Sequence, residues 1–148
     1  MPKFPSELSS PWWPALLGAQ PSVGMWMSTR QMPVAGLQPS VSPYNDFNLG
    51  DHVGDDLGRV QAHREAVQKH CQAQPVWLQQ VHGNRVVRLS HGPDATVQVD
   101  GQPLQGQPQA DGAFTTEPGL VCTVMVADCL PVLLAAPEGR GVAALHAG

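Results

Sequence analysis

The sequence predicts a mixed α and β domain in which strands outnumber helices. Short apolar or alternating runs recur between turns rich in Gly and Pro, which is typical of strands, and only one segment has the apolar spacing of an amphipathic helix. The chain has 148 residues, of which 42% are hydrophobic. That is enough for one domain with a core of its own.

The N-terminal third is predicted to be largely irregular. Residues 1–21 form a leader in which repeated prolines exclude regular helix. A strand is expected over 23–29, because apolar residues alternate there. A loop rich in Pro, Gly, Ser and Gln follows over 31–43.

The segment GDDLGRVQAHREAVQKHC, residues 54–71, is predicted to be the one secure helix. Asp55 or Asp56 can cap its start. Apolar residues at helical spacing share one face of this segment: Leu57, Val60, Val67 and Cys71. Arg64 lies on the same stripe, so its charge either reaches solvent at the edge of the helix or points into a polar site.

The remaining strands are predicted in the second half of the chain. They are expected at these positions: 76–81 and 85–89 on either side of a turn, then 120–127, 132–136 and 141–145. The run 120–127 is apolar almost throughout, as in a strand covered on both faces. A second polar loop is expected over 90–109.

Composition excludes some classes of partner. Only 14% of the residues are charged, the net charge is −4, and the eight Lys and Arg residues are scattered, which argues against a nucleic-acid-binding protein. The three cysteines are odd in number and show no CxxC spacing, as expected for reduced thiols in the cytoplasm. The N-terminus resembles neither a secretory signal nor a membrane span. We therefore expect a cytoplasmic protein without a membrane partner.

Three side chains follow apolar runs at predicted strand ends: His82 after VWLQQV, Cys129 after LVCTVMVAD and His146 after GVAAL. They are 47 and 17 residues apart, so no local metal-ligand spacing links them. A lone cysteine in an apolar segment is usually a core residue, which is the interpretation for Cys122. The other histidines are expected to be hydrogen-bonded surface residues: His52, His63, His70 and His91.

Five stretches in order resemble the YfiH family, whose members are called laccase-domain proteins, multicopper polyphenol oxidases or purine nucleoside phosphorylases. They are NLGDHVGDD (48–56), WLQQVHGNRVV (77–87), ADGAFTTEPG (110–119), VADCLPVLL (126–134) and AALHAG (143–148). The resemblance implies an α/β (α+β) layered sandwich with a mixed β-sheet core. It also implies that residues 22–148 are the N-terminal part of a laccase domain.

The resemblance implies a metal site of His82, Cys129 and His146, which are also the catalytic residues. Imidazole and thiolate ligands suit Zn²⁺ and leave a fourth position open, where water can be activated near neutral pH. The implied activities are phosphorolysis of adenosine, inosine and methylthioadenosine, and deamination of adenosine. The substrates are thus a purine nucleoside and phosphate. Arg30 and Arg64 match the family's arginines and are either phosphate ligands or structural residues.

Three further residues match the family motifs. Asn48 either orients a loop or touches the nucleoside. Asp128 is either an acceptor for a ligating imidazole or a cap of the strand end. Asp111 is interpreted as a turn residue rather than a catalytic acid.

Other functions remain open. A copper polyphenol oxidase would use the same ligands with a methionine, Met25, Met27 or Met125, as weak axial ligand. Laccase chemistry needs several coppers, however, and the leftover histidines are few and not clustered. A hydrolase without metal would use Cys129 as nucleophile and His146 as base. An inactive fragment that needs a partner is the last alternative.

The chain departs from the family pattern at several places. The loop after Arg30 is longer and lacks a Gly-Gly pair, 90–109 is longer than expected, and His63–Arg64 stands where the family has Asn-Arg. The family continues beyond HAG for roughly a hundred residues. We therefore expect a truncated domain that is incomplete at its C-terminus and prone to self-association through uncovered strands.

Overall fold

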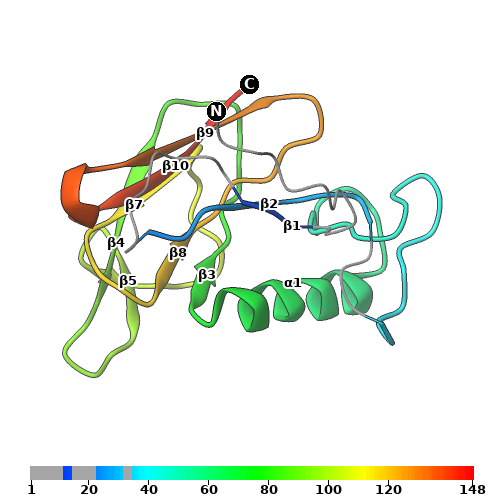
Figure 1. Ribbon diagram of the computed structural model, residues 1–148, viewed down its shortest axis with the longest axis horizontal. Coiled ribbons are helices and arrows are strands. Elements are labelled where there is room, and N and C mark those ends of the chain that lie inside the picture. The colour runs from blue at the N-terminus through cyan, green and yellow to red at the C-terminus, as the bar shows by residue number, and fades with distance from the viewer. Residues whose placement is uncertain (1–11, 15–22, 32–34) are drawn as a thin grey trace, which may run out of the picture. The chain divides into compact units, whose positions relative to one another are not determined.

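The computed structural model describes residues 12–14, 23–31 and 35–148 (Figure 1). The chain divides into two compact units. The first comprises Met1–Gly18 and Gly24–Ala66, and the second comprises Ala19–Val23 and Val67–Gly148. Most of the leader predicted over 1–21 lies outside the described residues. No helix in the described part of the chain is both long and apolar enough to cross a membrane.

The first unit contains two short strands, a long loop and most of the only α-helix of the described residues. Strand β1 (Trp12–Pro14), within the predicted leader, pairs antiparallel with β2 (Trp26–Ser28). β2 is shorter than the predicted strand over 23–29. Residues 35–56 form a loop that continues to the helix, and its Phe47 is buried.

Helix α1 spans Leu57–Cys71 and confirms the predicted helix. Asp56 caps it, because its Oδ1 accepts a hydrogen bond from Arg59 N at 2.9 Å. The helix ends where Gln72 takes the left-handed conformation, with φ 52°. Val60 and Arg64 are buried as the stripe predicts, whereas Leu57 at the first turn is exposed.

The second unit is built on a mixed six-stranded sheet, as predicted. Its spatial order is β6-β5-β4-β7-β10-β9, in which only β4 and β7 are parallel neighbours. The strands are β4 (Val86–His91), β5 (Val97–Val99), β6 (Gln102–Pro103), β7 (Gly112–Thr115), β9 (Leu130–Ala135) and β10 (Val142–Ala147). A short 3₁₀ turn, η1 (Pro137–Gly139), connects the last two strands.

A small parallel sheet covers one face of the large sheet. It pairs β3 (Gln74–Val76) with β8 (Leu120–Cys122). Apolar residues from both sheets form one buried cluster: Val76, Leu78, Val87, Leu89, Val97, Ala110, Ala113 and Leu120. The core of the second unit therefore lies between the two sheets.

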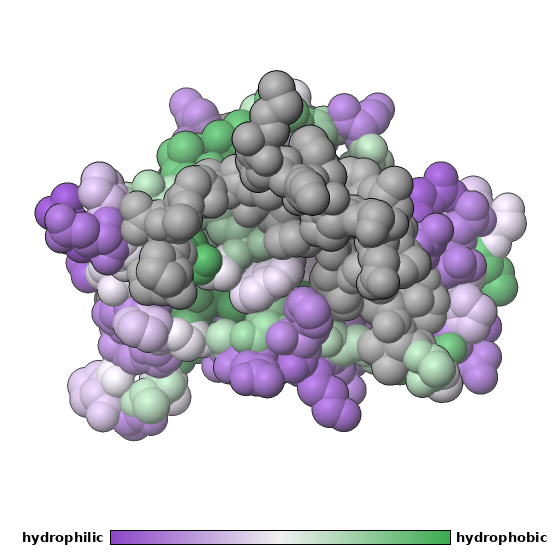
Figure 2. Space-filling view, viewed as in Figure 1, coloured by the Kyte–Doolittle hydropathy of each residue, from purple (hydrophilic) through white to green (hydrophobic). Residues whose placement is uncertain are grey.

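The opposite face of the large sheet carries exposed apolar side chains over β7, β10 and β9. Register places Phe114 of β7, Ala143 of β10 and Leu134 of β9 side by side on this face. Leu130 and Leu134 are 64% and 50% exposed. Figure 2 shows hydrophobic surface (green) where β9 lies in Figure 1. β9 is also an edge strand, with one side of its backbone unpaired in the described sheet.

Several predicted strand limits are wrong. Residues 77–81 make only an isolated bridge between Gln79 and Gln109, and 123–127 lie outside any strand. The predicted polar loop 90–109 contains β5 and β6. These strands form a hairpin around Asp100-Gly101, which have φ values of 52° and 79°. An Asp-Gly pair between short runs is a hairpin signature that could have been read from VQVDGQP.

Candidate metal centre

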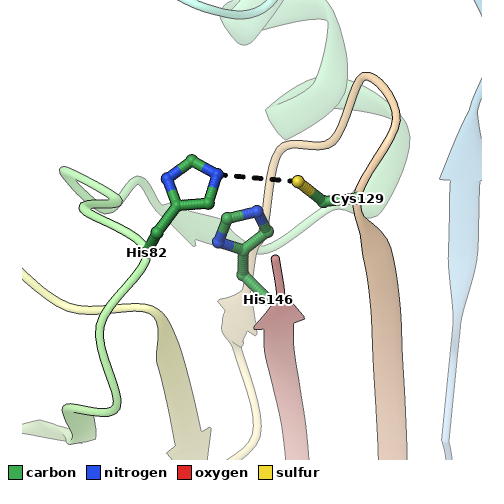
Figure 3. A group of neighbouring side chains, drawn as sticks. All are labelled: His82, Cys129 and His146. Atoms are coloured by element: carbon green, nitrogen blue, oxygen red, sulfur yellow. Dashed lines mark hydrogen bonds between the residues drawn. The ribbon is translucent and has the colours of Figure 1, made fainter.

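The second unit brings His82, Cys129 and His146 together (Figure 3). One potential ligand atom from each side chain lies within 4.8 Å of the other two. His82 is exposed, Cys129 is half-buried, and the His146 side chain is only 3% exposed. The group therefore has a buried inner ligand and ligands that face solvent.

The register of two antiparallel strands explains why Cys129 meets His146. His146 pairs with Pro131 and Ala147 pairs with Leu130, so the end of β10 lies beside the start of β9. Cys129 immediately precedes β9 and thus lies at the same end of the pair. His82 reaches this point from the loop before β4 (Figure 3). Residues that are 47 and 17 positions apart in the chain become neighbours in this way.

The distances fit a tetrahedral ion. Cys129 Sγ lies 3.6 Å from His82 Nε2, and the rings of His82 and His146 are 4.7 Å apart at their centroids. Zn²⁺ bound by thiolate at about 2.3 Å and by imidazole at about 2.0–2.1 Å separates the two ligand atoms by about 3.5 Å. Imidazole nitrogen and thiolate sulfur are both ligands that Zn²⁺ takes in proteins.

Gly148 leaves space at the centre of the group. A Cβ added there would lie 2.5 Å from His82 Cδ2, 2.9 Å from His146 Cε1 and 3.0 Å from Cys129 Sγ. All three distances are below ordinary van der Waals contact. Any larger residue at this position would therefore press on all three ligand side chains at once.

Asp111 supports two of the three ligand-bearing segments. Its side chain is 2% exposed, and Oδ1 lies 2.8 Å from His146 Nδ1. The backbone N–H groups of three consecutive residues, Val81, His82 and Gly83, also donate to its carboxylate. Burial by itself raises the pKa of this carboxyl, but the hydrogen bonds from His146 and from the three N–H groups outweigh it, so the pKa is lowered.

The prediction of Asp111 as a turn residue does not include this role, which the sequence pattern does not indicate. The role follows from the register between β7 and β10. Gly112 pairs with Leu145, so Asp111 lies beside His146. That pairing joins residues far apart in the chain and is not visible in one sequence. Asp128, predicted as either an imidazole acceptor or a strand cap, is exposed, and its Oδ1 lies 3.9 Å from Cys129 Sγ.

The predicted substrate-binding residues lie in the first unit, which we describe by itself. Arg30 is exposed, and its carbonyl accepts a hydrogen bond from Phe47 N. Arg64 is 8% exposed, with Nε donating to Leu49 O at 2.9 Å and Nη1 donating to Asp51 at 3.2 Å. Burial lowers the pKa of Arg64, and the charge and hydrogen bond of Asp51 oppose that effect. Nε and Nη1 of its guanidinium are thus directed at the loop.

Asn48 and His63 complete this polar group. The Asn48 amide accepts from Gly50 N and donates to Gly50 O and to Asp55. His63 is fully buried, so its prediction as a surface residue is wrong. Its Nδ1 lies 2.9 Å from Asn48 O and its Nε2 lies 2.9 Å from Gln38 O. We call Asn48, Asp51, Asp55, His63 and Arg64 the loop–helix cluster.

Another cysteine, Cys122, is not one of the grouped ligand side chains. Cys122 packs against the core cluster, as predicted. Burial raises the pKa of its thiol to about 12. His91, also as predicted, is a surface residue whose Nδ1 lies 3.0 Å from Glu117.

Known proteins resemble this chain over most of its length. Residues 25–148 match the family model described as multi-copper polyphenol oxidoreductase laccase. The purine nucleoside phosphorylase YfiH of Escherichia coli K12 is 39% identical over 145 residues, which are 97% of this chain and 51% of that protein. A purine nucleoside phosphorylase of Haemophilus influenzae is 44% identical over 111 residues, 74% of this chain and 41% of that protein.

A solved structure has a similar fold. A crystal structure of a Neisseria meningitidis protein of the DUF152 family superposes with a TM-score of 0.76 at 34% identity. The match covers 94% of this chain and 51% of that one. The chain thus spans about half the length of the relatives it matches. It belongs to the multi-copper polyphenol oxidoreductase laccase family, which includes the YfiH proteins.

Proposed function

We propose that His82, Cys129 and His146 hold a Zn²⁺ ion and that this chain carries the metal centre of a purine nucleoside phosphorylase. The observation that supports this most directly is the convergence of the three ligand atoms within 4.8 Å. Relatives at 39–44% identity are named purine nucleoside phosphorylases, which supports the substrate class. Adenosine, inosine and methylthioadenosine are the nucleosides we propose.

The residues divide the work of the site. When bound, the ion supplies a Lewis acid with one open position. Cys129 contributes a negative thiolate and the histidines contribute neutral imidazoles, so the ion keeps a net positive charge toward an incoming anion. In phosphorolysis a phosphate oxygen forms a bond to C1′ of the ribose, the C1′–N9 bond breaks, and the purine leaves with the electron pair and takes up a proton. In deamination water adds at C6 and ammonia leaves.

Phosphate needs cationic donors as well. Arg30 and Arg64 are the arginines we propose as its ligands, and Asn48 as a contact of the nucleoside. Arg30 is exposed, so its guanidinium is accessible to an anion. Arg64 already binds Leu49 O and Asp51, so a phosphate would compete with Asp51 for it.

Metal analysis is the first test. The untagged protein should contain about one zinc per chain, the Cys129→Ala variant should lose it, and Cys71→Ala should keep it, because Cys71 lies on α1 away from the ligand group. Full zinc content in Cys129→Ala would show that the ion binds elsewhere.

Activity is the second test. Adenine and inosine are measured by chromatography after incubation with adenosine, with and without phosphate, for the parent, His82→Ala and Arg30→Ala. His82→Ala should abolish both products. Arg30→Ala should reduce adenine formation far more than inosine formation, because only phosphorolysis binds the phosphate dianion. A zinc-loaded parent that forms neither product would contradict the proposed activity of this chain.

A copper oxidase is the second candidate, favoured by the description of the family model. The ligands would be the same, and a copper–thiolate centre of Cys129 would give an intense visible band. Copper in place of zinc in the purified protein, together with oxidation of a phenol by the parent but not by Cys129→Ala, would select this function.

The same variants distinguish a metal-free enzyme from the zinc and copper enzymes. Cys129 Sγ lies near His82 Nε2, and His146 is hydrogen-bonded to Asp111 through Nδ1. His82 and His146 are therefore the two candidate bases for a thiol nucleophile at Cys129. Activity that survives removal of the ion by a chelator but not Cys129→Ala would establish this mechanism.

A further inference from the structure

Each oxygen of the Asp111 carboxylate faces two hydrogen-bond donors. Oδ1 faces His82 N at 2.9 Å and His146 Nδ1 at 2.8 Å, and Oδ2 faces Gly83 N at 2.8 Å and Val81 N at 3.2 Å. An ionised carboxylate only accepts hydrogen bonds. The hydrogen between Asp111 and His146 therefore belongs to Nδ1 of the imidazole.

We propose that Asp111 is the positioning residue of the metal centre, holding the proton of His146 on Nδ1 so that Nε2 presents its lone pair to the ion. A neutral imidazole has one N–H and one lone pair, and the partner of one nitrogen decides which is which. With Nδ1–H donated to Asp111, Nε2 is the only nitrogen of His146 that can bind a metal. The inference rests on the proposed metal site and adds to it a residue that does not touch the ion.

The same carboxylate orients the segment of a second ligand. His82 has φ 57°, a left-handed conformation that non-glycine residues rarely adopt and that strains the backbone. Three consecutive N–H groups converge on Asp111 around this residue and offset the strain. Without the carboxylate, these donors lose their acceptor and the His82 side chain loses its fixed direction.

The backbone of Asp111 makes the link tighter. Its N–H donates to Arg85 O at 2.9 Å, and its carbonyl accepts from His146 N at 2.8 Å. Asp111 is therefore bonded on one side to the loop that carries His82 and on the other to both the backbone and the ring of His146. Asp128, by contrast, is exposed, and its Oδ1 lies 3.9 Å from Cys129 Sγ.

The Asp111→Asn variant tests the direction of the proton. An amide has one oxygen and one NH₂ in place of the two oxygens. If the NH₂ faced Val81 and Gly83, it would oppose two N–H donors, whereas facing His146 it opposes only that of His82. The NH₂ therefore faces His146, donates to Nδ1 and moves the imidazole hydrogen to Nε2, onto the ligand atom.

The measurement is ¹⁵N NMR of the histidine side chains in metal-free protein, with His146 assigned by His146→Gln. The parent should carry its hydrogen on Nδ1, and Asp111→Asn should carry it on Nε2. Zinc affinity, measured by competition with a chromogenic chelator, should fall about 10- to 100-fold in Asp111→Asn. Asp100→Asn is the matched control, because Asp100 also accepts hydrogen bonds from a backbone N–H and an arginine but touches no ligand.

Each outcome decides the inference. A parent with the hydrogen of His146 on Nε2 would overturn it, even if Asp111→Asn failed to fold. Equal zinc affinity in Asp111→Asn and Asp100→Asn would also overturn it. The proposed function fails separately: a parent that binds no zinc but carries the Nδ1 hydrogen would refute the metal site while leaving the orientation of His146 by Asp111 in place.

Discussion

The metal centre and the loop–helix cluster use similar side chains in opposite ways. Both contain a histidine, at least one carboxylate and hydrogen bonds to a long loop. In the metal centre one carboxylate, Asp111, binds the backbone, and the ligand atoms of the other side chains face one another. In the loop–helix cluster the side-chain nitrogens that could contact a ligand face the backbone instead. Both ring nitrogens of His63 and Nε of Arg64 are directed at carbonyl oxygens.

The difference shows how a chemical site is separated from a structural one when both are polar and partly buried. Atoms that already have good partners stabilise the fold, whereas atoms of several side chains that converge without a shared partner are suited to bind something else. By this criterion the His82–Cys129–His146 group is the candidate site of chemistry. The substrate-binding role of Arg64 and Asn48 stays a prediction that has to be tested beside their structural role.

Arg64→Ala gives the largest expected effect on the loop–helix cluster. It leaves Asp51 and the Leu49 carbonyl without this partner, and breaking a buried ion pair of this kind costs about 3 kcal/mol, a low value in the usual range because Asp51 is 28% exposed. Denaturant unfolding measures the loss. A structural Arg64 predicts equal decreases in phosphorolysis and deamination, and a larger decrease in phosphorolysis would show that it also binds phosphate.

His63→Leu should cost about 2 kcal/mol, because the buried carbonyl that accepts the ring N–H of His63, that of Asn48 or that of Gln38, loses its donor. His63→Asn is the matched variant. It restores the residue of the family pattern, and its NH₂ group has two donors. We expect His63→Asn to unfold at a denaturant concentration closer to the parent than His63→Leu does. Equal destabilisation by both variants would mean that packing against Phe47, 4.9 Å away between ring centroids, matters more than the hydrogen bonds.

Gly148→Ala should act on the metal centre alone. The added methyl group presses on all three ligand side chains, and overpacking of about 1–3 kcal/mol corresponds to a loss of about 5- to 150-fold in zinc affinity. Ala147→Ser, a change of similar size at the exposed neighbouring residue, should leave the affinity unchanged. Unfolding of the metal-free protein should be the same for both. Undiminished zinc affinity in Gly148→Ala would place the ion away from the centre of the three side chains.

The cysteines provide the smallest and most direct contrast. With its pKa raised to about 12 by burial, Cys122 has only about 0.01% thiolate at pH 8, so iodoacetamide should leave it unmodified in native protein. Its alkylation should rise about tenfold per pH unit as pH increases toward that pKa. Half-buried Cys129 should react at pH 8 in metal-free protein and be protected by zinc. Mass spectrometry of digested protein distinguishes the two sites, and zinc-independent labelling of Cys129 would contradict its assignment as a ligand.

The sequence predicted much of the fold through local patterns. Helix α1, its cap at Asp56 and the strands around η1 depend on residues close in the chain. The hairpin of β5 and β6 was missed although Asp100-Gly101 marks it, because the polar composition of that segment favoured a loop. The run after Cys122 was predicted as strand from hydrophobicity alone, which does not tell whether a backbone has a partner.

The candidate site was predictable only in part for the same reason. His82, Cys129 and His146 could be named by motif, and the structure brings them together. Asp111 could not, because its role depends on the pairing of β7 with β10. Self-association stays a prediction, for which the exposed apolar face around Leu134 and the edge strand β9 are the structural basis.

The spacing of the ligands along the chain has a consequence for folding. An ion bound by residues 82, 129 and 146 is a reversible cross-link that closes loops of 47 and 17 residues. In the chain-entropy model, links over such loops each restrict the unfolded ensemble by about 3–4 kcal/mol, as a disulfide of the same span would. A chelator would then act on this chain as a reductant acts on a disulfide-bonded protein. It would release the two loops that the ion closes without breaking a bond of the polypeptide.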